Sequence, residues 1–419
     1  MKQFYFTFFV VLFFSSIGIS QVILDAELRP RFEYRHGYKT LFPDNTDPAA
    51  FISQRTRLNA FYSDETLTFY LSAQDIRVWG DVPQTNIADK NGVGIHQAWG
   101  EIKFTPEFSV KLGRQALVYD DHRILGSVDW VQQARSHDLA LLKLHKNNFS
   151  GHLGIAFNQD EEALTGNTLH TNTYKAMQYV WLNKKWEDIG ASFLLLNNGM
   201  QYIDALSERD NEIRYSQTFG THLTYNKNKF GLMANLYYQT GTDVNDNDLS
   251  AYLLGIEAGY QVNSIWTLQV GAELQSGNDY GAPSDGKNKA FTPLYGTNHK
   301  FNGHMDYFYV GNHGNNVGLL DVYIGSTIKT GEKTDFGIRV HNFNAAANMV
   351  NNTSKQLGTE ADISFNYKFT NAINIKAGYS HMFASKGMEQ LKNNFDGNVN
   401  NWGWIMVTLK PTLFSSANN

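Results

Sequence analysis

The chain has 419 residues, of which 14% are aromatic and 18% charged, with 8 prolines, 35 glycines and no cysteine. A formal net charge of −5 gives no sign of the basic face that a nucleic-acid binder needs, and the missing cysteines exclude disulfides, thiolate metal sites and a cysteine nucleophile. Beyond the first twenty residues no uncharged apolar run reaches about 18 residues, which argues against a helical membrane protein.

Residues 1–20 have the features of a secretory signal peptide. Lys2 supplies the positive start, an apolar stretch runs from Phe4 to Phe14, and small residues stand before Gln21. The apolar stretch is too short for a membrane anchor. We therefore expect a mature chain from about residue 21, which forms one domain over 21–419.

The rest of the chain repeats with a period of two. From 25 to 35 every odd-numbered residue is charged and every even-numbered residue is apolar or aromatic. The same alternation returns at 335–341, 359–369 and 373–383. A β-strand sends alternate side chains to opposite faces, so each of these segments predicts a strand with one polar and one apolar face.

Loop lengths indicate what kind of sheet these strands form. Eighteen strand-like segments are expected, and they begin near residues 23, 51, 66, 96, 108, 135, 149, 174, 186, 213, 230, 249, 266, 317, 334, 357, 373 and 401. The seventeen connections between them alternate without a break between long and short. Outer-membrane barrels have tight periplasmic turns and long extracellular loops, whereas a soluble sandwich has no reason to separate loop lengths in this way.

The predicted fold is therefore all-β, a transmembrane antiparallel up-and-down barrel of about 18 strands with both termini in the periplasm. Such a barrel belongs in the outer membrane of a Gram-negative bacterium, with membrane lipid around it. The segment 277–316 is the longest connection and is rich in aromatic residues, so we expect it to fold into the lumen or over its mouth.

Eighteen strands leave a water-filled lumen, and charged residues of the N-terminal third are the candidates to line it. The candidate pathway residues are Arg29, Arg31, Arg55, Arg57, Arg77, Arg114, Arg123, Arg135, Asp75 and Glu101. One interpretation is an anion-selective constriction, because arginine groups favour anionic permeants. The other is a wall stiffened by arginine–carboxylate pairs with no preference for a substrate.

Several motifs in this region resemble those of the bacterial alginate-export outer-membrane family. They include the segments 54–58 (QRTRL), 74–80 (QDIRVWG), 112–115 (LGRQ), 119–126 (YDDHRILG) and 291–306 (FTPLYGTNHKFNGHMD). The resemblance implies an 18-stranded barrel that passes an anionic polysaccharide through an arginine-rich constriction, with periplasmic export components as possible partners. The C-terminal half has far fewer arginines, which leaves a complete cationic ring in question.

Two other functions stay open, a general or small-solute porin and an outer-membrane hydrolase. We expect no enzyme, because no serine, histidine and amide or carboxylate can be assembled at one depth. Ser136 and His137 are adjacent and leave opposite faces of a strand. Neither the aspartates of 243–248 nor His299, His304 and Asp306 have a recognised ligand spacing. No metal or cofactor is therefore expected.

Overall fold

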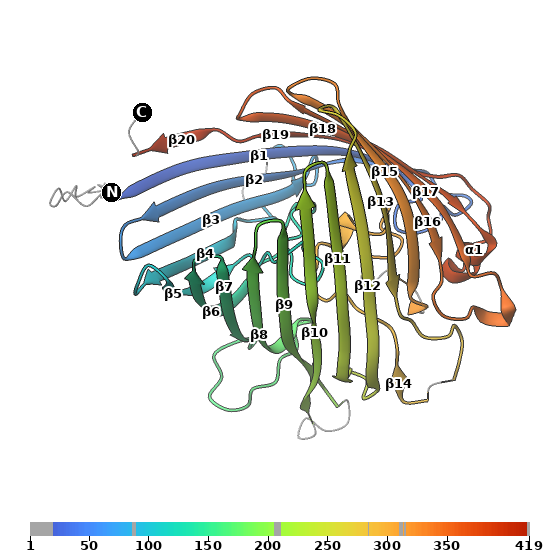
Figure 1. Ribbon diagram of the computed structural model, residues 1–419, viewed down its shortest axis with the longest axis horizontal. Helices are drawn as coiled ribbons and strands as arrows, with labels where there is room; N and C mark the ends of the chain where they lie inside the picture. The colour runs from blue at the N-terminus through green and yellow to red at the C-terminus, as the bar shows by residue number, and fades with distance from the viewer. Residues whose placement is uncertain are drawn as a thin grey trace.

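The computed structural model describes residues 20–416, apart from 86–88, 205–210, 284, 310–312 and 314–315. The predicted signal peptide lies almost wholly outside this part of the chain and stays a prediction. The wall is one antiparallel sheet in which consecutive strands pair, and β1 pairs both with β2 and with the last long strand, β19. This pairing closes an 18-stranded barrel (Figure 1).

The strands of the first half are β1 (Gln21–His36), β2 (Ala49–Ser63), β3 (Leu67–Val78), β4 (Gly94–Lys103), β5 (Phe108–Gln115), β6 (His137–Lys146), β7 (Phe149–Phe157), β8 (Tyr174–Lys185) and β9 (Ile189–Tyr202). Those of the second half are β10 (Glu212–Lys227), β11 (Phe230–Thr242), β12 (Asp248–Gln261), β13 (Trp266–Gln275), β15 (Leu319–Lys329), β16 (Thr334–Asn344), β17 (Gln356–Lys368), β18 (Ile373–Ala384) and β19 (Asn400–Leu409). Two short strands, β14 (Lys287–Asn288) and β20 (Thr412–Ser415), and the helix α1 (Lys386–Lys392) complete the fold.

The predicted barrel is confirmed, and each of its 18 strands begins within three residues of the expected position. Turns at the end that holds both termini have between two residues (147–148) and four (330–333). Connections at the opposite end range from five residues (243–247) to the segment 276–318. Among the described residues, no helix is both long enough and apolar enough to cross a membrane.

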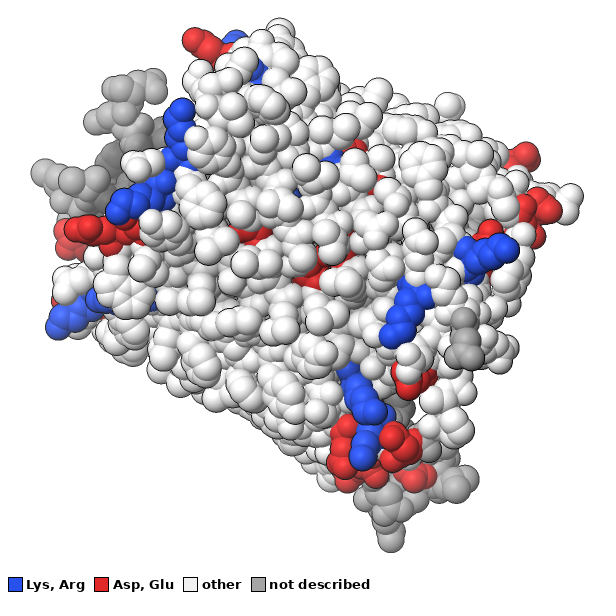
Figure 2. Space-filling view, turned by 45° about the vertical axis from the view of Figure 1, so that its right-hand side comes forward, with Lys and Arg blue, Asp and Glu red and all other residues white. Residues whose placement is uncertain are grey.

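The two faces of the wall differ as the period of two requires. On β12, Leu254 and Ile256 point outward and are 43% and 53% exposed, whereas Leu253, the residue before Leu254, points inward and is fully buried. On β1 the inward-pointing Arg29 is 4% exposed. Figure 2 shows the consequence on one side of the barrel, where charged side chains gather toward the margins and uncharged residues cover most of the middle.

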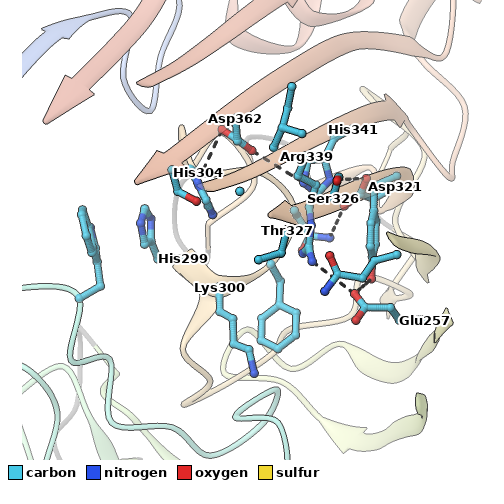
Figure 3. Close-up of a pocket in the computed structure, with 18 of the residues that line it drawn as sticks. Glu257, His299, Lys300, His304, Asp321, Ser326, Thr327, Arg339, His341 and Asp362 are labelled. Atoms are coloured by element: carbon cyan, nitrogen blue, oxygen red, sulfur yellow. Dashed lines mark hydrogen bonds and ion pairs between the residues drawn. The ribbon is translucent and has the colours of Figure 1, made fainter. Parts of the chain in front are cut away.

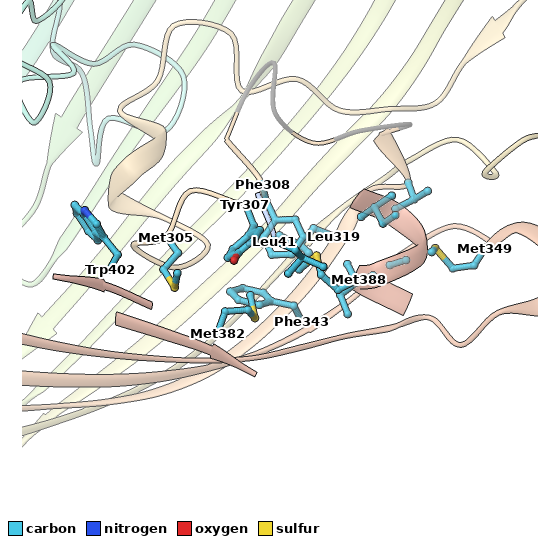
Figure 4. Close-up of a cluster of buried hydrophobic side chains, with 14 of the residues drawn as sticks. Leu41, Met305, Tyr307, Phe308, Leu319, Phe343, Met349, Met382, Met388 and Trp402 are labelled. Carbon is cyan, nitrogen blue, oxygen red and sulfur yellow. The ribbon is translucent and has the colours of Figure 1, made fainter. Parts of the chain in front are cut away.

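Two extracellular connections turn back into the barrel and fill much of its interior. Loop 116–136 packs with residues 291–295 against the inner faces of β6–β12, where Leu125, Met177 and Phe291 are buried. Residues 305–308 pack with α1 against β15–β19, where Met305, Tyr307 and Trp402 are buried (Figure 4). The expectation that 277–316 folds into the lumen is confirmed.

Candidate functional site

Loop 116–136 is held against β1 and β2 by two of the predicted pathway arginines. Arg29 donates to the carbonyl oxygen of Asp129 at 2.8 Å and to the side-chain oxygen of Gln132 at 3.0 Å. Arg55 donates to the carboxylate of Asp129 at 2.8 Å and to Glu27 at 2.5 Å. The two arginines are only 4% and 1% exposed. They anchor a loop and leave no free guanidinium face for a permeant.

Arg31 and Arg57 extend this anchor. Arg31 pairs with Glu33 at 2.8 Å, donates to the carbonyl oxygen of Trp130 at 2.6 Å and lies over the Trp130 ring. Arg57 donates to Gln74 at 2.9 Å and lies 3.5 Å from the carboxylate of Asp129. Burial tends to raise the pKa of Asp129, but the guanidinium groups around it outweigh burial and hold that pKa below its usual value.

Arg123 and Arg135 join the two inward loops to each other. Arg123 is 1% exposed and donates to Glu273 of β13 at 2.5 Å and to Asn302 of the second loop at 3.1 Å. Arg135 donates to the carbonyl oxygen of Gly296 at 3.3 Å. Both predicted pathway residues therefore serve the junction between loops.

Arg77 and Asp75 lie on the outer face of the wall, which corrects the prediction that they line the pathway. The register pairs them with Gln54 and Thr56, whereas the residues of β2 that point inward are odd-numbered, such as Arg55. Residues that pair across two strands lie on the same face of the sheet. Odd-numbered residues therefore face the lumen on β2, and even-numbered residues face it on β3. Arg77 there pairs with Asp75 at 2.7 Å. The sequence already indicated the outward position, because the apolar residues Leu67, Phe69 and Leu71 are odd-numbered like Arg77 and so lie on the same face of the strand.

Arg114 is a second correction of the same kind. It pairs in register with Ala98 of β4 and Asp138 of β6, on the outward face, and forms an ion pair with Asp138 at 2.7 Å. Both charged side chains are about half exposed. The apolar Val110 and Leu112 of the same strand share its parity, so the alternation already placed it outside.

Glu101 does face the lumen, close to the periplasmic turn after β4. Lys143 and Ser109 donate to one of its carboxylate oxygens, at 2.8 and 2.6 Å. Next to it on β5, the Lys111 ammonium lies 3.7 Å from the ring centre of Trp99. This part of the lumen therefore carries two lysines beside one carboxylate.

A cavity of about 720 Å³ occupies the C-terminal side of the lumen (Figure 3). Its roof is the segment 298–304 together with Trp130, and its walls are the inner faces of β11–β19. Along β16 the lining extends from Asp335, next to a periplasmic turn, to His341 in the middle of the strand. The cavity thus runs from the periplasmic end of the barrel to the inward loops.

The charged side chains that line this cavity differ in how exposed they are and in whether a partner of opposite charge binds them. Glu273, Asp321 and Asp362 are less than a tenth exposed and bind Arg123, His341 and Ser380. Four cationic side chains line the same space, namely Lys300, Arg339, Lys368 and Lys376. Within the described residues, no carboxylate forms an ion pair with the three lysines, and Arg339 reaches Glu257 at 3.5 Å.

Sequence reasoning missed these cations because it concentrated on the arginines of the N-terminal third. Lys368 and Lys376 stand at polar positions of the alternating segments 359–369 and 373–383, so the same alternation could have identified them. Lys300 lies in the inward loop, and no periodicity marks it.

Histidines and carboxylates hold the second loop in place. His299 bonds to Asp306 at 2.8 Å, and the hydroxyl of Tyr38 donates to the same carboxylate at 2.5 Å. His304 lies 3.7 Å from Asp362 (Figure 3). Burial tends to raise the pKa of Asp306, but the donors His299 and Tyr38 outweigh it and hold that pKa below its usual value. In the part of the chain that the structure describes, no three His, Asp or Glu side chains are arranged to hold a metal ion.

A closed 18-stranded barrel with an apolar outer face, a charged interior and inward loops defines the class of outer-membrane porins. The chain belongs to the alginate export family, whose model matches residues 20–317. This places it in the outer membrane of a Gram-negative bacterium. No curated protein is significantly similar to it in sequence.

Solved porin structures have the same fold. OpdO of Pseudomonas aeruginosa is 11% identical with a TM-score of 0.61, and the alignment covers 94% of this chain and 98% of that chain. OccAB4 of Acinetobacter baumannii is 12% identical with a TM-score of 0.62, over 95% and 99% of the two chains. At these identities the likeness shows the fold alone.

Proposed function

We propose that this porin passes an anionic polysaccharide or oligosaccharide across the outer membrane, and that lysines attract it. The observation that carries the proposal is the excess of accessible cations over accessible carboxylates in the cavity below the inward loops. Lys300, Lys368 and Lys376 have no acidic partner among the described residues, whereas most of the acids in that space are buried and bound. Low-dielectric walls focus the field of such charges on a permeant.

This proposal gives the arginines a different role from the one that the sequence suggested. Arg29, Arg55 and Arg123 are buried and bound to carboxylates and amides, so they fix the loops that narrow the lumen. The proposal thus combines the two sequence interpretations, with lysines in place of arginines as the selective groups. Arginine–carboxylate pairs stiffen the interior, and separate lysines supply selectivity.

Ion selectivity in planar bilayers tests the proposal. The double variant Lys368→Gln, Lys376→Gln should shift the reversal potential toward cations, and the shift should shrink as salt rises, since the Debye length is about 10 Å at 0.1 M. Arg77→Gln and Arg114→Gln are matched controls, because both lie outside the wall and should leave the potential unchanged. A wild-type channel that prefers cations at low salt would contradict the proposal and favour a small-solute porin.

The small-solute porin is the second candidate, and the contact between the two inward loops favours it because a narrow lumen restricts permeant size. We do not propose an enzyme. Ser150 and His145 are hydrogen-bonded at 2.7 Å beside a periplasmic turn, with no carboxylate bonded to that histidine among the described residues, and the other pair is Ser136 and His96, whose atoms Oγ and Nδ1 are 3.0 Å apart. The Ser136 hydroxyl is placed to donate to the carbonyl oxygen of His96, and no described carboxylate hydrogen-bonds to that histidine.

A further inference from the structure

The two inward loops are joined along a short backbone seam. Gly126 donates its N–H to the carbonyl oxygen of Tyr295 at 2.9 Å, and Tyr295 donates to Ile124 at 3.1 Å. At the end of this seam, the N–H of Val128 donates to the hydroxyl of Thr297 at 3.1 Å. The seam makes the two loops one partition across the lumen.

Beyond Val128 and Thr297 the loops separate toward different walls. Residues 129–132 go to Arg29 and Arg55 on β1 and β2. On the other side, the N–H of Met305 donates to Glu360 of β17 at 2.8 Å. Gly303 permits this approach, because a Cβ there would lie only 2.6 Å from the Glu360 carboxylate. The partition therefore contains a fork, and its branches are fixed to different strands of the wall, one to β1 and β2 and the other to β17.

Stacked rings fill the fork. The rings of Trp130 and His299 are 4.4 Å apart and nearly parallel, with an interplanar angle of 16°. Arg31 covers the indole at 4.2 Å, and His304 stacks on His299 at 5.6 Å. We call Arg31, Trp130, His299 and His304 the ring stack. Three of its members, Trp130, His299 and His304, also form part of the cavity roof.

We propose that the contact between Trp130 and His299 is the gate of the pathway, and that it sets the largest permeant that can leave the cavity. The inference rests on the proposed transport function and assigns its size limit to two residues. Trp130 and His299 come from different loops, meet through their ring faces alone and share no hydrogen bond. Both rings also pack edge-on against Trp402 of β19, at 5.6 and 5.7 Å, whereas hydrogen bonds hold each branch to the wall, so we take the stacked pair as the contact at which the two branches separate.

The fork can open without release of the loops. Asp129 and Gln132 keep Trp130's branch on the wall, while Asp306 and Glu360 keep the branch of His299 in place. Rotation of the Trp130 ring away from His299 would leave these anchors intact, whereas rotation of the His299 ring would break its own bond to Asp306. The cavity would then communicate with the space above the partition.

Conductance of the purified barrel tests the gate. Trp130→Ala and His299→Ala should each raise single-channel conductance severalfold and admit larger neutral polymers in exclusion measurements. Trp130→Phe retains a stacking ring and should restore the wild-type value. Trp266→Ala is the matched control, since it removes a tryptophan from the outer face of β13 and should change neither quantity. Conductance of Trp130→Ala equal to that of wild type would overturn the gate.

A reversible lock separates gating from altered folding. The chain has no cysteine, so a Trp130→Cys, His299→Cys double variant can be bridged by a short bifunctional thiol reagent and released by reductant. Bridging should lower conductance and reduction should restore it in the same channel. Switching of equal size in the single-cysteine variants would overturn the proposal.

Reversal potentials from the same recordings keep the two proposals apart. A channel that prefers cations but opens in Trp130→Ala supports the gate and refutes anion transport. An anion-selective channel whose conductance does not respond to either substitution overturns the gate and leaves the proposed function standing.

Discussion

Replacing Arg123 with methionine should loosen the junction between the two inward loops. The Arg123–Glu273 ion pair is almost completely buried, with 1% and 9% of the side chains exposed. Removal of one partner from such a pair costs about 3–5 kcal/mol, because the other charge stays buried and uncompensated. Glu273 keeps donors from Asn302 at 3.0 Å and Gln275 at 2.9 Å, so we expect the lower end, about 3 kcal/mol.

A loss of this size has a measurable consequence. About 3 kcal/mol corresponds to roughly a hundredfold rise in the population with separated loops. In planar bilayers Arg123→Met should therefore show frequent steps to higher conductance, and on gels the folded barrel should convert to the unfolded form at a lower temperature. The double variant Arg123→Met, Glu273→Gln removes the uncompensated charge and should recover part of the loss.

The control is an ion pair on the outer face. Arg77 is 32% exposed and pairs with Asp75, so Arg77→Met should cost only about 0–1 kcal/mol and leave conductance unchanged. The reasoning is refuted if Arg123→Met has the same conductance as wild type and shows no steps to higher conductance. It is also refuted if Arg77→Met produces the same steps, since the effect would then not depend on burial.

Three further predictions concern topology, packing and pH. Cysteines placed in 158–173 should label with an impermeant reagent on intact cells and a cysteine at Asn371 should not; the reverse pattern would contradict the topology. Phe291→Ala should destabilise the folded barrel by about 3–5 kcal/mol in thermal unfolding, because Phe291 is 2% exposed between the first inward loop and the wall. The pKa of Asp129 is lowered in the folded protein, so ionised Asp129 stabilises the docked loop at every pH above its ordinary pKa of about 3.9. This stabilisation is lost as the pH falls through the lowered pKa. Conductance should therefore stay constant from neutral pH to about 4 and change below it, and Asp129→Asn should abolish that change.

Local pattern was sufficient to predict the wall of the barrel. Each strand must place apolar side chains toward lipid and polar ones toward water. Apolar and polar residues therefore alternate along consecutive positions, as in 25–35. Turns and loops alternate because each strand must return through the membrane. The same alternation also indicated the correct side for Arg77 and Arg114, and the choice of charged residues by their type and place in the N-terminal third led to the wrong side.

The interior could not be predicted in the same way. Arg29 meets Gln132 about a hundred residues later in the chain, and Arg123 meets Glu273 across 150 residues. Whether an inward arginine faces water or a carboxylate depends on which loop fills the lumen beside it, and no periodicity records that choice. The sequence by itself determined the strands, their faces and the topology, because lipid constrains every residue of the wall locally. Only closure of the barrel decided that the arginines anchor loops, that lysines line the cavity and that Trp130 meets His299, because these contacts exist only once both loops share one enclosed space.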